Sequence, residues 1–195
     1  GTCLLVETDQ GLVLVDSGVG LHDYLDPSPM VRFFQLDFGI HTDPENAAVR
    51  QIVRLGYSPQ DVRHIVLTHL HFDHAGGLPD FPHAQVHVHR REYEAMQRPR
   101  RFIEWAYDRK DIQHQPSWVF YEQTDAEWLG FEAMRLPFSP EMYLVPLFGH
   151  TAGHCGVAVQ DKDGWIFNCA DALPTHAQFD LTPAWLNRLV LGTHV

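Results

Sequence analysis

The feature that most constrains this chain is the segment THLHFDHAGG at residues 68–77, which directly follows an apolar run. Along an extended or tightly turning backbone, alternation sends His69 and His71 to one side and the two intervening apolar side chains into the core. Asp73 and His74 follow at once and can address a second position nearby. Imidazole nitrogen and carboxylate oxygen suit Zn, Fe, Mn or Co, whereas the lack of thiolate argues against a structural zinc site. The segment therefore predicts a metal site at the end of a buried strand.

Two later segments carry further ligand types. His150 lies in the glycine-flanked sequence GHTAGH at residues 149–154, and Asp171 ends the apolar stretch at residues 165–171. The two residues are 21 positions apart, because 171 − 150 = 21. That distance fits a loop, a strand, a turn and a second strand, so both residues can return to the same sheet edge. We therefore expect His150 and Asp171 to join the cluster.

The rest of the sequence predicts a mixed, layered α/β domain in which strands outnumber helices. Residues 18–43 carry two prolines and several aromatics without a clean period, so we interpret them as a long loop. A helix is expected to begin at Asp43-Pro44 and to end at Gly56. The remaining predicted elements are strands at residues 2–8, 12–16, 64–68, 85–89, 118–122, 142–145, 155–160 and 165–169, and helices at 91–97 and 184–190.

Length and charge limit the partners. The 195 residues suit one domain, residues 1–195, that is large enough to bury a core without disulfides. A net charge of −11 argues against nucleic acid or an anionic membrane surface as the main partner. No apolar run approaches the roughly 18 residues that cross a bilayer. The three cysteines form no CxxC pair, which favours a reducing, cytoplasmic setting.

Together, these segments resemble the motifs of the metallo-β-lactamase-fold hydrolase superfamily. THLHFDHAGG matches its HxHxDH signature, GHTAGH its second ligand loop, and CADA at residues 169–172 its bridging acid. Leu14-Val15-Asp16-Ser17-Gly18 resembles the family's early strand-turn motif. The resemblance implies an α/β four-layer αββα sandwich with metals in a cleft at one edge of the sheets. It also implies the ligand set, in which one metal is held by His69, His71 and His150, the second by Asp73 and His74, and both by Asp171.

The two-metal members of the family normally have one more histidine, on a loop well beyond the bridging aspartate. His176 follows Asp171 too closely, and His194 lies 23 positions beyond it, where a helix and a further strand are usually still to come. Gly1 is not an initiator methionine, and residues 2–6 are typical of a strand already under way. We therefore expect the natural chain to be incomplete here at both termini and to continue past Val195.

The resemblance implies hydrolysis by a hydroxide that two divalent ions share, most often Zn, with Fe, Mn or Co as alternatives. The resemblance also implies a catalytic role for Asp73, which would orient the hydroxide and then pass a proton to the leaving group. Asp16 and Thr68 are the candidates for orienting the metal-binding histidines. His154 is expected to line the loop rather than to bind metal.

The stretch between His74 and His150 is long and rich in aromatic residues, which indicates an apolar substrate wall. Its spacing most resembles the N-acyl homoserine lactonase branch, so the expected substrate is a small lactone, ester or related acyl compound, and a homodimer is a candidate assembly. Members of that branch commonly carry a tyrosine soon after the bridging acid, whereas Ala172-Leu173-Pro174 follows here. The expected wall comprises Met30, Phe33, Phe34, Phe38, Tyr93, Met96, Phe102, Trp105, Tyr107, Trp118, Phe120 and Tyr121.

Three other functions remain open on the same scaffold. A mononuclear-iron persulfide dioxygenase needs fewer ligands, and a glutathione-thioester hydrolase uses similar chemistry, although no basic cluster for glutathione is evident. A catalytically silent binding protein is disfavoured by the intact ligand set up to Asp171. Among the remaining histidines, His83, His87 and His89 alternate along a predicted strand without a nearby acid, which favours a solvated strand face.

Overall fold

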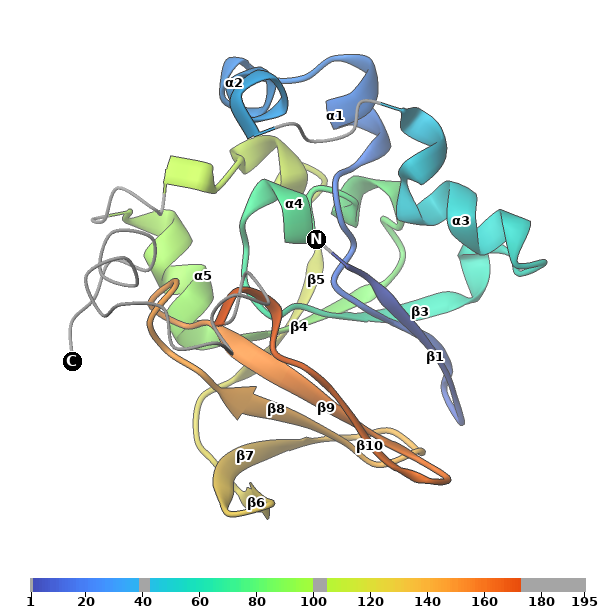
Figure 1. Ribbon diagram of the computed structural model, residues 1–195, viewed down its shortest axis with the longest axis vertical. Coiled ribbons are helices and arrows are strands. Elements are labelled where there is room, and N and C mark those ends of the chain that lie inside the picture. The colour runs from blue at the N-terminus through green and yellow to red at the C-terminus, as the bar shows by residue number, and fades with distance from the viewer. Residues whose placement is uncertain (1, 39–42, 100–104, 173–195) are drawn as a thin grey trace.

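The computed structural model describes residues 2–38, 43–99 and 105–172, and it consists of two β-sheets with helices against one of them (Figure 1). The strands are β1 (Leu4–Thr8), β2 (Gly11–Val15), β3 (Val62–Val66), β4 (Gln85–His89), β5 (Ser117–Tyr121), β6 (Ala126–Trp128), β7 (Phe131–Leu136), β8 (Met142–Pro146), β9 (Cys155–Asp161) and β10 (Gly164–Asn168). The α-helices are α1 (Leu21–Leu25), α2 (Pro29–Phe38), α3 (Ala48–Arg54), α4 (Phe72–Ala75) and α5 (Arg90–Gln97). Short 3-10 turns are η1 (Pro44–Asn46), η2 (Pro59–Asp61), η3 (Leu78–Asp80), η5 (Arg109–Ile112) and η6 (Ala170–Ala172).

The first sheet has the strand order β1-β2-β3-β4-β5. The predicted hairpin of β1 and β2 is antiparallel, and β2 to β5 run parallel to one another. Parallel strands are normally covered on both faces, which is why β3 and β4 are almost continuously buried. Because these strands run the same way, the segments after β2 and β3 leave the sheet at one edge, and the metal-binding sequence begins there.

The second sheet is antiparallel, with the order β10-β9-β8-β7-β6. Strands β8, β9 and β10 lie within about two residues of their predicted positions, but β6 and β7 were not predicted. Both turn residues of their hairpin, Leu129 and Gly130, have positive φ (50° and 88°). Leucine is uncommon in that conformation, so no ordinary turn signal marks this hairpin in the sequence.

The core has two layers separated by the first sheet. Val13 and Val15 of β2 face the second sheet and pack with residues such as Leu144 and Val157. The alternate residues of β2 face the helices, where Ile52 of α3 joins them. Each fully buried aliphatic side chain contributes on the order of 1.5–3 kcal/mol. The period-two alternation of β2 therefore fixes which side of the sheet holds the helices.

The prediction of a long loop at residues 18–43 was wrong, because α1 and α2 form there. Ser28 precedes α2, and its Oγ accepts a hydrogen bond from Val31 N at 3.3 Å. Val31 is fully buried, but Phe33 and Leu36 are 53% and 79% exposed. These exposed apolar side chains obscure the helical period in the sequence. The predicted N-cap Asp43 is present, accepting a bond from Glu45 N at 3.0 Å before η1.

Some predictions fall outside the described residues, namely the helix at 184–190, Phe102, and the two later histidines His176 and His194. Within the described part of the chain, the helices are too short and too polar to span a bilayer.

Candidate metal centre

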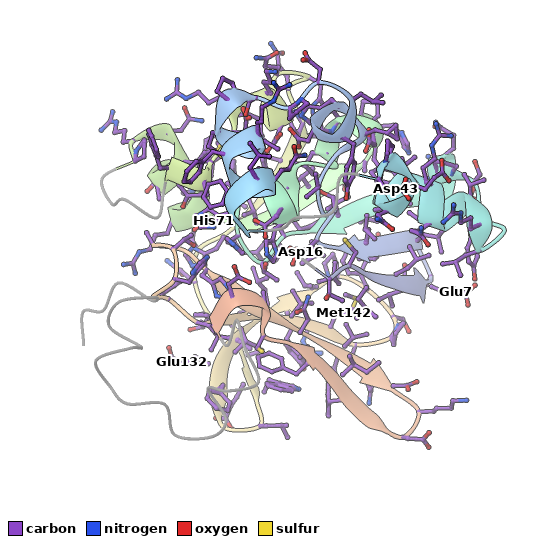
Figure 2. The ribbon with its side chains drawn as sticks, turned by 45° about the horizontal axis from the view of Figure 1, so that its top comes forward. Glu7, Asp16, Asp43, His71, Glu132 and Met142 are labelled. Atoms are coloured by element: carbon purple, nitrogen blue, oxygen red, sulfur yellow. The ribbon has the colours of Figure 1, made fainter. Side chains whose placement is uncertain are left out.

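The metal-binding sequence forms a tight turn after β3. His71 is the N-terminal cap of the one-turn helix α4, and His74 N and Ala75 N donate to His71 O at 2.9 and 2.8 Å. Asp73 and His74 sit on that turn, and η6 brings Asp171 to the same place from the end of β10. Figure 2 shows His71 on the side of the helical layer that faces the second sheet.

The structure brings all six predicted ligands together. His150 Nε2 lies 3.1 Å from His71 Nδ1 and 3.2 Å from Asp171 Oδ2, and His69 Nε2 lies 3.8 Å from the same oxygen. On the other side, His74 Nε2 lies 3.5 Å from Asp171 Oδ1. The donor atoms form two groups, each within 4.8 Å, namely His69, His71, His150 and Asp171, and Asp73, His74 and Asp171. Asp171 belongs to both groups, as a bridging acid must.

The imidazole nitrogens of the cluster have the burial and the protonation state that metal ligands need. Among the described residues, the Nε2 atoms of His69, His71 and His74 are buried and have no hydrogen-bond partner. Burying an unpaired polar atom costs free energy, so these nitrogens, which belong to the two adjoining donor groups, fit electron-pair acceptors such as metal ions. Burial and the neighbouring imidazoles lower the pKa of His69 and His71 well below the ordinary value, which keeps their nitrogens neutral. Neutral imidazoles with carboxylates form a donor set for a divalent ion.

A buried network around Asp16 orients two of these imidazoles. The Asp16 carboxylate accepts from Thr68 N at 2.8 Å, from Thr68 Oγ1 at 2.9 Å and from His74 Nδ1 at 2.9 Å. Because the Thr68 hydroxyl donates to Asp16, it accepts from His69 Nδ1 at 3.1 Å. Both histidines therefore hold a proton on Nδ1 and turn Nε2 toward the cluster. Asp16 and Thr68 thus occupy the orienting positions that the sequence suggested.

The second group of donors already stabilises positive charge. Burial by itself lowers the pKa of His74, but Asp73 and Asp16 outweigh it and hold that pKa well above the ordinary value. For Asp171, burial opposes ionisation, but the contacts with His74 and His150 hold its pKa below the usual range. These carboxylates provide the negative potential that a cation would neutralise.

Glu92 on α5 connects the two ligand loops, and sequence reasoning did not identify it. Its Oε1 accepts from Leu70 N at 3.0 Å, and its Oε2 accepts from Thr151 Oγ1 at 2.6 Å and Gly153 N at 3.0 Å. The side chain is completely buried. A Cβ at Gly153 would lie 2.2 Å from Glu92 N, so the GHTAGH loop needs glycine there to approach α5. Glu92 stands in a strongly polar helix, so nothing in the sequence distinguished it from a solvated acid.

His154 is buried against the cluster without joining either ligand group. Its ring centroid lies 5.0 Å from that of His69, and its Nδ1 lies 3.2 Å from Leu147 O. Burial lowers its pKa to about 3, so the ring is neutral. The expectation that it lines the loop agrees with this position.

The interpretation of the β4 histidines as a solvated face was wrong for two of the three. His83 is exposed just before the strand, but His87 and His89 are buried. His87 Nε2 lies 3.0 Å from His64 Nδ1, and His87 Nδ1 lies 2.9 Å from Tyr121 Oη. The strand lies inside a parallel sheet, whose faces are both covered, and the polar rings are tolerated because His87 pairs with His64 and His89 accepts from Arg91 N.

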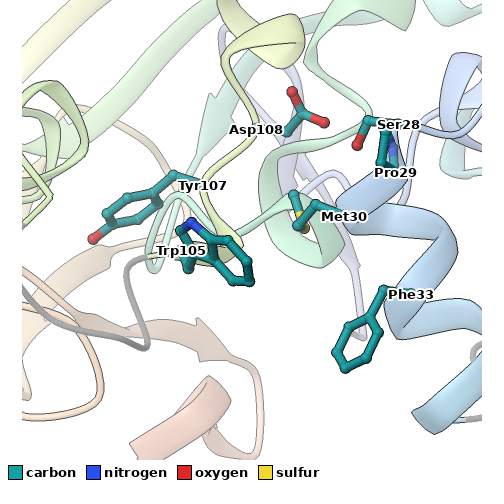
Figure 3. Close-up of a pocket in the computed structure, with 7 residues that line it drawn as sticks. All are labelled: Ser28, Pro29, Met30, Phe33, Trp105, Tyr107 and Asp108. Carbon is teal, nitrogen blue, oxygen red and sulfur yellow. The ribbon is translucent and has the colours of Figure 1, made fainter.

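An apolar hollow of about 650 Å³ lies beside the cluster, and Figure 3 shows Trp105 and Tyr107 across it from Phe33, with Met30 between them. The Tyr107 ring also lies 5.1 Å from the His71 ring, and its hydroxyl donates to Glu92 at 2.9 Å. Four members of the predicted wall therefore line this hollow. The lining residues are Ser28, Pro29, Met30, Phe33, Trp105, Tyr107 and Asp108.

Other members of the predicted wall belong to the core instead. Tyr93, Trp118 and Phe120 pack against one another beneath the helices, with ring centroids 5.1–6.0 Å apart. Tyr121 packs between the sheets. Strand β5 forms the sheet edge next to β4, so its aromatics cover the sheet rather than the hollow.

Comparison with known proteins places this geometry in a family. The model of the metallo-beta-lactamase superfamily matches residues 1–190. A probable metallo-hydrolase of Mycobacterium tuberculosis is 43% identical over 172 residues, which cover 87% of this chain and 55% of that protein. An N-acyl homoserine lactonase of Bacillus cereus is 27% identical over 187 residues, covering 91% of this chain and 66% of the relative.

The solved structures agree in fold. The structure of an N-acyl homoserine lactone hydrolase with the product N-hexanoyl-L-homoserine at its catalytic metal centre superposes with a TM-score of 0.65 at 27% identity, over 91% of this chain and 66% of that one. The chain thus spans between about half and two thirds of the length of these relatives. Two sheets, flanking helices and a His/Asp cluster at their edge agree with the matched model, and the chain belongs to the metallo-beta-lactamase superfamily.

Proposed function

We propose that this chain carries the active site of a metal-dependent hydrolase that opens a lactone, ester or related acyl bond in a small molecule. The observation that carries the proposal is the position of Tyr107, which contacts the His71 ring on one side and lines the apolar hollow on the other. An acyl chain in the hollow would thus have its polar end next to the ligand cluster.

The donor groups suit two divalent ions, with Zn first and Fe, Mn or Co as alternatives. In this assignment His69, His71 and His150 would hold one ion, Asp73 and His74 would hold the other, and Asp171 would contribute to both. Ions held in this way lower the pKa of bound water toward neutrality and polarise a substrate carbonyl.

Asp73 has a second role in the proposal, as the catalytic acid and base. Its side chain is 27% exposed, and its Oδ2 lies 3.5 Å from His74 Nε2, so the carboxylate stands where the cluster opens to solvent. From there it can take a proton from the attacking water and deliver it to the leaving alkoxide. The described candidate ligands include two carboxylates, Asp73 and Asp171. Asp171 belongs to both donor groups, whereas Asp73 belongs to one.

The acyl substrate class is supported by the hollow and by the lactonase relatives. Its walls are mostly apolar side chains, and Ser28 and Asp108 place polar groups at one end. Apolar clefts with a few polar groups are typical of small-molecule sites. Relatives at 27% identity are named for N-acyl homoserine lactones, which combine an acyl chain with a hydrolysable ring ester.

The test is a substrate series with increasing acyl length. The metal-loaded protein is assayed with homoserine lactones and simple esters carrying short to long chains, and Trp105→Ala is compared with wild type. The proposal predicts hydrolysis that improves with chain length, and a KM for long chains that rises about tenfold in Trp105→Ala, equivalent to about 1.4 kcal/mol. Leu129→Ala, an exposed apolar residue in the β6–β7 turn, is the matched control. Oxygen uptake with persulfides, without hydrolysis of any ester, would refute the proposal.

A further inference from the structure

A second cluster of ligand-type side chains lies in the helical layer, outside the metal centre. His22 and Asp23 belong to α1, and Asp111 belongs to η5. His22 Nε2 lies 3.3 Å from Asp23 Oδ1 and 3.3 Å from Asp111 Oδ1, and one ligand atom of each residue lies within 4.8 Å of the other two. None of the three belongs to the ligand motifs at residues 68–77, 149–154 and 169–172.

The carboxylates of this cluster lack the partners that buried acids normally have. Asp23 is 0% exposed and Asp111 is 1% exposed. Among the described residues, neither oxygen of either carboxylate has a hydrogen-bond partner of good geometry, and Asp108 Oδ2 nearby is also buried without one. Two buried carboxylates beside a single imidazole leave uncompensated negative charge, which is costly unless a cation or a proton neutralises it.

The spacing of the atoms suits a small divalent cation. Ligand atoms about 2.0–2.1 Å from a tetrahedral ion lie about 3.3 Å from one another. The two contacts of His22 Nε2 have this length, which is long for a charge-assisted hydrogen bond. A hollow of about 510 Å³ lies beside the cluster, and its lining includes His22, Asp26, Lys110 and His114, so His22 can be reached from outside the protein.

The protonation of the two acids makes cation binding depend on pH near neutrality. Burial raises the pKa of Asp23 to about 6 and that of Asp111 to about 7. Protons and metal ions therefore compete for the same oxygens at pH 6–7, and the ion gains the advantage as pH rises above that range.

The position of the cluster gives the ion a structural role. A Cβ at Gly76, directly after α4, would lie 2.7 Å from Asp23 Oδ2, and one at Gly20 would lie 2.0 Å from Gly76 O. Helix α1 therefore rests on the end of the turn that carries Asp73 and His74. We propose that His22, Asp23 and Asp111 form a further divalent-cation site, separate from the metal centre, that fastens α1 and η5 to α4.

The experiment counts Zn²⁺ ions per chain at pH 8 after dialysis against excess Zn²⁺ and then against metal-free buffer. Wild type is compared with Asp111→Asn and Asp23→Asn, which keep the side-chain shapes, and with Asp26→Asn. Asp26 is an exposed acid that lines the same hollow, so it is the matched control. The proposal predicts one ion fewer in the first two variants and an unchanged count in Asp26→Asn.

A second measurement separates this site from the metal centre. In His69→Ala protein, which has an altered metal centre but an intact second cluster, Zn²⁺ should raise the melting temperature, and adding Asp111→Asn should reduce that shift, whereas adding Asp26→Asn should not. Equal ion counts in wild type, Asp111→Asn and Asp23→Asn would overturn the proposal and assign the cluster to proton sharing. That outcome leaves the proposed hydrolase untouched, because the metal centre uses none of these residues.

Discussion

At the scale of single residues, the candidate ligands are held by neighbours that do not contact the metal position themselves. Asp16 and Thr68 fix the tautomers of His74 and His69, and Glu92 ties together the loops that carry His71 and His150. Such support sets the direction of each lone pair before any ion binds. Substitutions of the supporting residues should therefore affect metal affinity as well as folding.

Asp73→Asn tests the proposed proton transfer. Asparagine retains an oxygen that can bind a metal ion, but it cannot accept and deliver a proton. We expect kcat to fall by about 10²–10⁴-fold, with a much smaller change in metal content. The pH–rate profile should also lose the limb that reports the acid. An unchanged turnover number would rule out this role, and loss of the metal in proportion to the rate would reduce Asp73 to a ligand.

Glu92→Gln tests the connection between the ligand loops. The amide NH₂ would face at least one of the donors that now point at the carboxylate, namely Leu70 N, Tyr107 Oη, Thr151 Oγ1 and Gly153 N. We expect the free energy of unfolding to fall by about 1–3 kcal/mol. Chelator competition should show weaker metal binding, while KM changes less than kcat. Glu94→Gln, an exposed acid on the same helix, is the control, and identical behaviour of the two variants would contradict the role of Glu92.

At the scale of elements, the buried histidines of β3 and β4 make the first sheet sensitive to acid. Burial lowers the pKa of His87 to about 3, with His64 as a further cause. The unfolded chain takes up a proton near the ordinary pKa of about 6.5, whereas the folded chain does not. The contribution to stability is therefore complete above pH 6.5 and is lost as pH falls toward 3.

His87→Gln should remove this dependence. Between pH 6.5 and 5, the wild type should lose up to about 2 kcal/mol of unfolding free energy through His87, at roughly 1.4 kcal/mol per pH unit. The variant should be less stable at pH 7.5 but show a flatter acid limb in denaturant titrations. His83→Gln, an exposed histidine just before β4, should keep the wild-type slope. Parallel pH curves for wild type and His87→Gln would contradict the account.

The elements also show which parts of the fold a sequence can predict. Strand β4 was predicted at its observed bounds, because its flanking residues and β-branched valines are typical of a strand. Helix α2 was missed because Phe33 and Leu36 are exposed. The six candidate ligands could be named from the sequence because they lie in local patterns, whereas the partners of Glu92 are contributed by separate segments of the chain. The burial of His87 depends on the neighbouring strands, which no local pattern reveals.

At the scale of the whole molecule, the two sheets bring together segments far apart in sequence. Cys155 N at the start of β9 donates to Thr68 O after β3 at 2.9 Å, so the second sheet is joined to the first next to the metal centre. Figure 1 shows the sheets meeting below α4, with β9 and β10 leading toward it. The cluster therefore depends on the sandwich being closed, and metal binding should stabilise the whole fold.

The most direct test of the central claim is elemental analysis of metal per chain, made on Asp111→Asn protein so that the second cluster does not contribute. We expect about two Zn, Mn or Co ions per chain. His69→Ala or His150→Ala in the same background should lower the ion count and abolish hydrolysis together, because each removes a donor. A protein that binds no metal after reloading, or a single iron with oxygenase activity, would contradict the dinuclear hydrolase.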